Sequence, residues 1–158
     1  HIFLKTLLDY AGESGPIDIG RTIYGKPQLR DINASINFNI SHSDNITVGT
    51  IHTLPVGIDI EAKNRAYDID NEFIYSEVFT SRLEALSALK KNTFIELWTI
   101  KEAVLKASGY GLWGGLKNIS INMVNHQQGR ASFLNQNFEI EVVSIGTYIV
   151  AVALATFD

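Results

Sequence analysis

The chain has 158 residues, 46% of them hydrophobic and 19% charged, a composition that predicts one globular unit with a substantial core. Its formal net charge of -4 argues against general nucleic-acid binding, because proteins of that class hold phosphate with clustered Lys and Arg. Since it has no cysteine, and its longest apolar run (147–157) is about half a membrane span, we expect a cytoplasmic protein without disulfides or a membrane segment.

The first part of the chain predicts one short helix followed by strands. Apolar residues recur with helical spacing over residues 2–11, and Gly12 follows as a stop. A loop comes next, with "YGKP" at 24–27 as its turn. Alternating apolar and polar side chains, or short β-branched runs, then predict three strands, at residues 36–41, 46–52 and 56–61.

The middle of the chain changes to helical spacing, and its end returns to strands. Two capping boxes, Ser81 with Glu84 and Thr93 with Glu96, begin two predicted helices, and Gly109 ends the second. The helices cover residues 81–91 and 93–108, and strands follow near residues 118–124, 130–134, 137–143 and 146–155. The order of strands, helices and strands predicts the α+β class.

Two acidic residues share one face of the third predicted strand. Side chains alternate along a strand, so Asp59 and Glu61 stand about 7 Å apart on one side, next to Gly57, which clears space there. Like charges this close repel unless a cation lies between them. On the second long helix, Glu102 and Lys106 are four residues apart and line up on one face.

Two interpretations of these residues stay open on spacing alone. Most Glu/Lys pairs of this kind are solvated surface pairs worth ~0.3 to 0.5 kcal/mol, and two acids on a strand are often only an exposed face. Alternatively, Asp59, Glu61 and Glu102 converge on Mg²⁺, an ion that takes one or two carboxylates together with substrate phosphates. Lysines nearby would then balance the phosphate charge.

Four motifs follow one another along the chain: "YGKP", "FNISHS", "VGIDIE" and "WTIKEAVLKASGYGL". In order and spacing they resemble the 4'-phosphopantetheinyl transferases, specifically the two-lobed type that activates peptide and fatty-acid synthases. The resemblance implies two pseudo-symmetric α+β lobes, each with an antiparallel sheet packed on helices. Residues 1–55 would form the first lobe, without the strand and basic helix that open it in the family. Residues 56–158 would form the second lobe and carry the metal site.

The resemblance also implies a reaction. A serine hydroxyl on an apo acyl or peptidyl carrier protein attacks the β-phosphate of coenzyme A, takes up phosphopantetheine and releases 3',5'-ADP, with Mg²⁺ bridging the pyrophosphate. By motif position the metal ligands are Asp59, Glu61 and Glu102, and the base is Glu102 or a metal-held water. Lys101 and Lys106 match the lysines that stabilise phosphate charge during transfer.

Three further residues match family positions that hold the nucleotide end of coenzyme A, including its 3'-phosphate: Lys26, Ser41 and His42. Ser41 falls on the polar face of its predicted strand, as a ligand contact would. By strict alternation His42 would point with Ile40 into the core, so it has to lie where the strand ends if it is to touch phosphate. We assign no metal role to Glu84, because it lies about one residue farther from the preceding aromatic residue than the corresponding acid does in the family.

Two alternatives remain. A chain without the front of its first lobe could be a non-catalytic relative that only binds coenzyme A or a carrier protein. A metal-dependent nuclease is the other, since "EAK" at 61–63, with Asp44 or Asp59 before it, loosely fits an acid, E-x-K arrangement, although the acidic balance of the chain opposes it. With two lobes in one chain we expect a monomer, and an incomplete front lobe would also allow a dimer.

Overall fold

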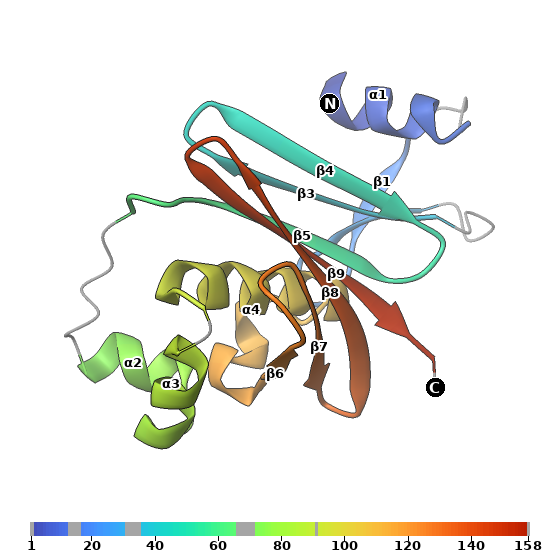
Figure 1. The fold of residues 1–158 in the computed structure, drawn as a ribbon. Coiled ribbons are helices and arrows are strands. Elements are labelled where there is room, and N and C mark those ends of the chain that lie inside the picture. Colours follow the sequence, from blue (N-terminus) through green and yellow to red (C-terminus); the bar gives the residue numbers. More distant parts are fainter. Residues whose placement is uncertain (1, 13–16, 31–35, 66–71, 91, 158) are drawn as a thin grey trace.

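The computed structural model describes residues 2–12, 17–30, 36–65, 72–90 and 92–157 of the chain (Figure 1). Its helices are α1 (Ile2–Tyr10), α2 (Glu72–Val78), α3 (Arg82–Leu89) and α4 (Phe94–Ser108), followed by two 3-10 turns, η1 (Gly111–Gly114) and η2 (Leu116–Asn118). Its strands are β1 (Ile19–Arg21), β2 (Pro27–Leu29), β3 (Asn37–Ser43), β4 (Ile46–His52), β5 (Val56–Ala62), β6 (Ser120–Met123), β7 (Gln128–Phe133), β8 (Gln136–Ile145) and β9 (Tyr148–Thr156).

The three sheets divide the chain near residue 55. Before that point the structure has two antiparallel hairpins, β1–β2 and β3–β4. After it, one five-stranded antiparallel sheet runs in the order β5-β9-β8-β7-β6 and curls around α4 (Figure 1). The predicted α+β class, with antiparallel sheets packed on helices, is therefore confirmed. The division into lobes at 1–55 and 56–158 stays a prediction.

Most predicted elements are present, and the β1–β2 hairpin and α2 were missed. The strand over 46–52 and the helix over 93–108 are confirmed within one residue at each end. The loop around "YGKP" was wrong in part, because its flanks pair as the β1–β2 hairpin and Gly25, with a φ of 88°, makes the turn. Each of these strands has three residues, which is too short to show an alternation. The helix α2 gave no periodic signal in the sequence.

Helix α4 is built from local signals and then buried on most sides. Thr93 accepts a hydrogen bond from the Glu96 backbone while the Glu96 carboxylate accepts one from the Thr93 backbone, which completes the predicted capping box. Gly109 ends the helix in the left-handed conformation, with a φ of 82°. The main apolar core lies between α4 and the concave face of the five-stranded sheet. This helix is therefore held firmly against the sheet that carries the two acids.

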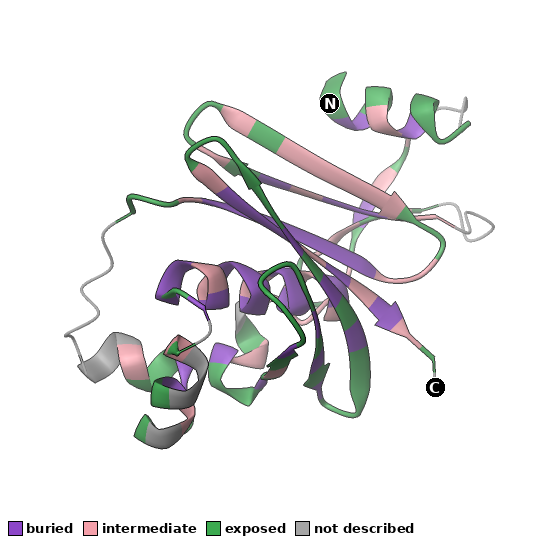
Figure 2. Cartoon of the chain, in the orientation of Figure 1, coloured by how far each residue is buried: buried purple, intermediate pink, exposed green. Residues whose placement is uncertain are grey.

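Strand β5 is covered on both faces (Figure 2). Ile58 and Ile60 point away from α4 and join Val150 of β9 in a small apolar cluster that β4 covers with Ile46 and Val48. This cluster ties the β3–β4 hairpin to the five-stranded sheet. Among the described residues, no helix is long and apolar enough to cross a membrane.

Candidate active site between β3, β5 and α4

Glycine at position 57 lets α4 lie directly against β5. A Cβ added to Gly57 would lie 2.1 Å from the Ala103 carbonyl oxygen and 2.3 Å from the Ala107 backbone nitrogen, closer than any side chain can approach. The acids that follow on the same face, Asp59 and Glu61, are consequently held beside the part of α4 that carries Lys106. The sequence predicted that this glycine clears space, and the structure shows that the helix backbone takes that space.

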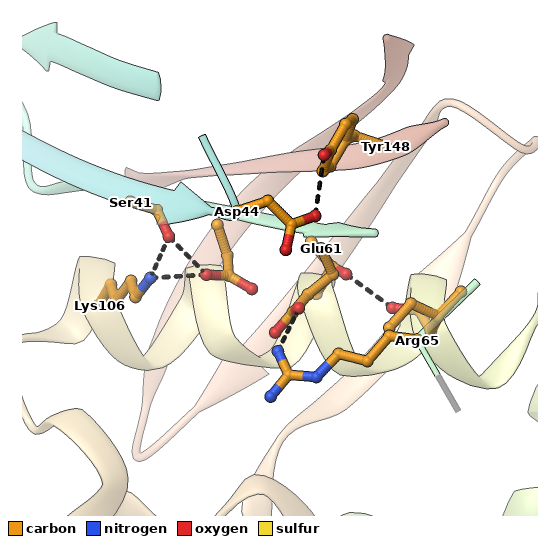
Figure 3. A network of polar contacts seen from close by, with 9 residues as sticks. Ser41, Asp44, Glu61, Arg65, Lys106 and Tyr148 are labelled. Atoms are coloured by element: carbon orange, nitrogen blue, oxygen red, sulfur yellow. Dashed lines mark hydrogen bonds and ion pairs between the residues drawn. The ribbon is translucent and has the colours of Figure 1, made fainter. Parts of the chain in front are cut away.

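Three side chains from three elements form a compact polar group (Figure 3). The Lys106 ammonium on α4 donates to the Ser41 hydroxyl on β3 at 2.8 Å and to Asp59 Oδ1 on β5 at 2.6 Å. The Ser41 hydroxyl donates to the same carboxylate oxygen at 2.8 Å. Ser41 and Asp59 are 6% and 5% exposed, so these bonds are shielded from water and strengthened by the low local dielectric.

The burial of Ser41 corrects the prediction for its strand. The alternation predicted that Asn39 and Ser41 would form the open, polar face of β3, but both side chains are buried. The reason is that β5 covers this face: the Asn39 side-chain oxygen accepts a hydrogen bond from the Ile58 backbone N–H at 2.8 Å. An asparagine thus takes the place of a neighbouring strand carbonyl and sets the position of β5 relative to β3.

Each acid on β5 has a cationic partner, but Asp59 keeps one oxygen free. Its Oδ2 is buried and has no hydrogen-bond partner. An ionised oxygen in that state is costly unless a cation or donor reaches it. Glu61 is paired differently, through its Oε2, with the Arg65 guanidinium at 2.5 Å.

Glu102 lies within the electrostatic reach of this group. The pKa of its carboxyl is raised to about 7, first by burial and then by the negative charges of Asp59 and Glu61, while the positive charges of Lys106 and Arg65 oppose the rise. A glutamate of this kind is half protonated near neutral pH and is able to accept a proton there. The three predicted acids are therefore coupled in one electrostatic group.

The oxygen atoms of these acids are ligands of the type that a divalent cation binds. Hard oxygen ligands are what Mg²⁺ selects, and the unpartnered Asp59 Oδ2 is a buried ligand atom of that type. Among the described residues, however, no three acidic or histidine side chains converge closely enough to enclose a metal ion. Side-chain cations, Lys106 and Arg65, contact Asp59 and Glu61 in this arrangement.

Lys101 does not join the acids. The residue is 1% exposed, and its ammonium donates to the Val78 carbonyl at 2.5 Å and lies 3.5 Å from Glu84 Oε1. The Glu84 carboxylate also accepts from the backbone N–H and the hydroxyl of Thr80, in place of the Ser81 backbone N–H. The other bond of the predicted capping box, from the Glu84 N–H to the Ser81 hydroxyl, is present at 3.1 Å. The position of Lys101 therefore gives no support to its predicted contact with phosphate.

Lys26 and His42 flank the acids from opposite ends of β5. Lys26 donates to the carbonyls of Val56 and Ala107, both at 3.2 Å, and burial lowers its pKa to about 8. It borders a cavity of about 200 Å³ at the end of α4. His42 is exposed one residue before β3 ends and borders an open cleft of about 460 Å³ near Ala62. As expected, His42 avoids the core by lying at the strand end.

Sequence reasoning missed Arg65 as a partner of the acids. It follows Glu61 by four residues, but that spacing has meaning on a helix and not after a strand. A bend makes the contact possible: the Arg65 N–H donates to the Ala62 carbonyl at 3.0 Å. Lys63, which a nuclease reading requires near the acids, instead donates to the Gly146 carbonyl at 2.9 Å.

Comparisons with known proteins match the chain to one family. The family model of the 4'-phosphopantetheinyl transferase superfamily matches residues 55–153. The chain is 33% identical over 110 residues to 4'-phosphopantetheinyl transferase ffp of Bacillus subtilis, a match covering 69% of this chain and 48% of that protein. It is 30% identical over 164 aligned positions to 4'-phosphopantetheinyl transferase HetI of a Nostoc species, covering 98% of this chain and 68% of that protein.

Among solved structures, the fold is similar to that of the holo-[acyl-carrier-protein] synthase of Helicobacter pylori in complex with coenzyme A. The TM-score is 0.51 at 19% identity, over 64% of this chain and 99% of that one. At such identity the likeness concerns the fold alone. The chain spans about half the length of several curated relatives that it matches, such as ffp at 48%. From the matched family model and these relatives, the chain belongs to the 4'-phosphopantetheinyl transferase superfamily.

Proposed function

We propose that the protein transfers the 4'-phosphopantetheine group of coenzyme A to a serine of an apo acyl or peptidyl carrier protein. The observation that carries this proposal is the buried contact of Lys106 with Ser41 and Asp59, next to Glu102. Asp59, Glu102 and Lys106 lie inside the segment that the family model matches. The serine oxygen attacks the β-phosphorus, and the bond from that phosphorus to the bridging oxygen breaks. The other product is 3',5'-ADP.

Glu102 is the proposed base in this reaction. Its pKa, raised by burial to about 7, suits a group that takes the proton of the incoming serine near neutral pH. Asp59, with Glu61 and Glu102, would hold Mg²⁺, and the ion would supply positive charge to the pyrophosphate. The free Oδ2 of Asp59 supports its place in this set.

Lys106 is the proposed phosphate contact on α4. Its side chain is 26% exposed, so its ammonium is able to reach both the acids and a ligand in front of them. Charge stabilisation of this kind is usually the main term in phosphoryl transfer. We do not extend the role to Lys101, whose ammonium is enclosed on the other side of the helix.

The nucleotide end of coenzyme A has two candidate positions, one at each end of β5. Since β5 rises by about 3.3 Å per residue, the cavity at Lys26 and the cleft at His42 lie roughly 20 Å apart. His42 is the better candidate for a phosphate contact, because it is exposed. Lys26 uses its ammonium on two backbone carbonyls, so a ligand would have to compete with them.

The test is to incubate the chain with Mg²⁺, coenzyme A and an apo carrier protein and to weigh the carrier by mass spectrometry. The carrier should gain the mass of one phosphopantetheine, and Asp59→Asn should prevent the gain. An unchanged carrier mass with the wild-type chain would contradict transferase activity. Lys63→Ala serves as the matched control for Lys106→Ala, because Lys63 is a cation turned toward Gly146.

A second candidate function is binding without transfer. It is favoured by the small size of the sheet that β3 and β4 form, a two-stranded hairpin that α1 covers through Leu4 and Leu8. Calorimetry with coenzyme A alone distinguishes the two functions, since a non-catalytic relative would bind the nucleotide and leave the carrier unmodified. Cytoplasmic location and a monomeric or dimeric state stay predictions.

A further inference from the structure

Both acids of β5 are neutralised by side-chain cations in this structure. Lys106 contacts Asp59 at 2.6 Å, and Arg65 contacts Glu61 at 2.5 Å. The side chains of the acids are 7% and 8% exposed, whereas that of Arg65 is 53% exposed. A half-exposed cation therefore contacts an almost buried anion, and the cation is the partner that solvent reaches.

The backbone around Arg65 is fixed independently of its side chain. The Lys63 N–H donates to the Thr147 carbonyl at 2.8 Å, which anchors the segment after β5 to the β8–β9 turn. Together with the bend at Ala62, this contact holds Arg65 where its guanidinium reaches back to Glu61 (Figure 3). Movement of the Arg65 side chain would remove this ion pair from Glu61 while these two backbone contacts stay in place.

A divalent cation and the guanidinium compete for the same carboxylate. Mg²⁺ requires its oxygen ligands at about 2.0 to 2.1 Å and in near-octahedral positions. A guanidinium hydrogen-bonded to Glu61 occupies part of that approach and repels the incoming charge. After release, Arg65 would face the open cleft that it borders together with His42 and Asn64.

We propose that Arg65 is a stand-in cation, which neutralises Glu61 in the absence of metal and is displaced when a divalent ion binds. The inference rests on the proposed function, because it takes Glu61 as a metal ligand. Arg65 is then a residue that sets metal affinity and does not itself take part in transfer. The alternative is that Arg65 stays bound to Glu61 and orients it toward the metal.

The experiment measures Mn²⁺ binding to the full chain without coenzyme A, by the loss of the free-ion electron paramagnetic resonance signal. Arg65→Gln should bind Mn²⁺ roughly fivefold more tightly than the wild type, the scale of a partly exposed ion pair. Lys63→Gln is the matched control, because it removes the same charge two residues away without touching an acid. Its affinity should change less than twofold, and Arg65→Lys should fall between Arg65→Gln and the wild type.

Weaker or equal Mn²⁺ binding in Arg65→Gln, relative to Lys63→Gln, would overturn the stand-in role and favour orientation of Glu61. A separate variant tests the underlying site: Asp59→Asn should lose Mn²⁺ binding. If Asp59→Asn binds as the wild type does, the proposed metal site fails, whatever Arg65 does. If neither the wild type nor Arg65→Gln binds Mn²⁺, with coenzyme A added or without it, both proposals are overturned.

Discussion

Lys101 and Lys106 carry the same charge on the same helix, yet they have opposite surroundings. Lys101 is enclosed between the Val78 carbonyl, Glu84 and the ring of Phe79, whose centroid is 5.3 Å from its ammonium. Lys106 instead contacts Ser41 and Asp59. Five residues turn a helix by about 500°, which leaves the two side chains about 140° apart. Membership of one motif therefore does not give two lysines one role.

A substitution at Gly57 should have the largest effect on the difference between Lys101 and Lys106. Gly57→Ala would push α4 away from β5, because the new Cβ meets backbone atoms that cannot move aside. We expect a loss of about 3 kcal/mol or more in the free energy of unfolding, and loss of transfer, since Lys106 moves off Asp59. Denaturant unfolding measures the first and the carrier mass the second.

The control for that variant is Gly146→Ala. This glycine has a φ of 57° and open space around it, so alanine should cost only about 1 kcal/mol of backbone strain. Equal losses in the two variants would show that the close approach of α4 and β5 is not what Gly57 provides.

The acidic partners of the two lysines separate activity from stability. Asp59→Asn should reduce transfer on the order of 100-fold or more, while the free energy of unfolding changes by less than ~1 kcal/mol. The small change is expected because Asp59 already carries an unpartnered buried oxygen. Glu84→Gln should do the reverse and lower stability with transfer kept within about twofold. Steady-state kinetics measure the transfer activity of both variants, and urea unfolding measures their stability.

The lysines themselves give the direct comparison. Lys101→Met should lower the free energy of unfolding by about 2 kcal/mol, because Glu84 and the Val78 carbonyl lose a buried donor. Lys106→Met should lower kcat by roughly tenfold or more. It should also lower stability, because the buried Asp59 loses its cation, so kcat is the measurement that distinguishes the two lysines. A fully folded Lys101→Met protein with a comparable loss of kcat would restore the predicted phosphate role of Lys101.

The pH dependence of stability tests the burial of Glu102. The pKa of Glu102 is near 4.5 in the unfolded chain and is raised by burial to about 7 in the fold, so the folded protein binds more protons between these values. Its contribution to stability is therefore complete below pH 4.5 and is lost as pH rises through 7. Glu102→Gln should flatten that part of the curve of unfolding free energy against pH, and an unchanged slope would place the carboxyl in a more open environment.

Local signals in the sequence predicted the elements that carry the site. The capping box at Thr93 and the stop at Gly109 bound α4 because both act within a few residues of backbone. The alternation in "VGIDIE" placed Asp59 and Glu61 on one face, since a strand has no other way to arrange neighbours two apart. The motifs were specific enough to predict the family that the comparisons confirm.

The partners of the side chains were decided by tertiary structure. Whether Ser41 is open or buried depends on β5, and whether Lys101 or Lys106 meets the acids depends on how α4 is rotated against the sheet. Arg65 reaches Glu61 only because a bend follows the strand. Periodicity is encoded by neighbours along the chain, whereas each of these contacts joins segments whose positions are set by packing of the whole core.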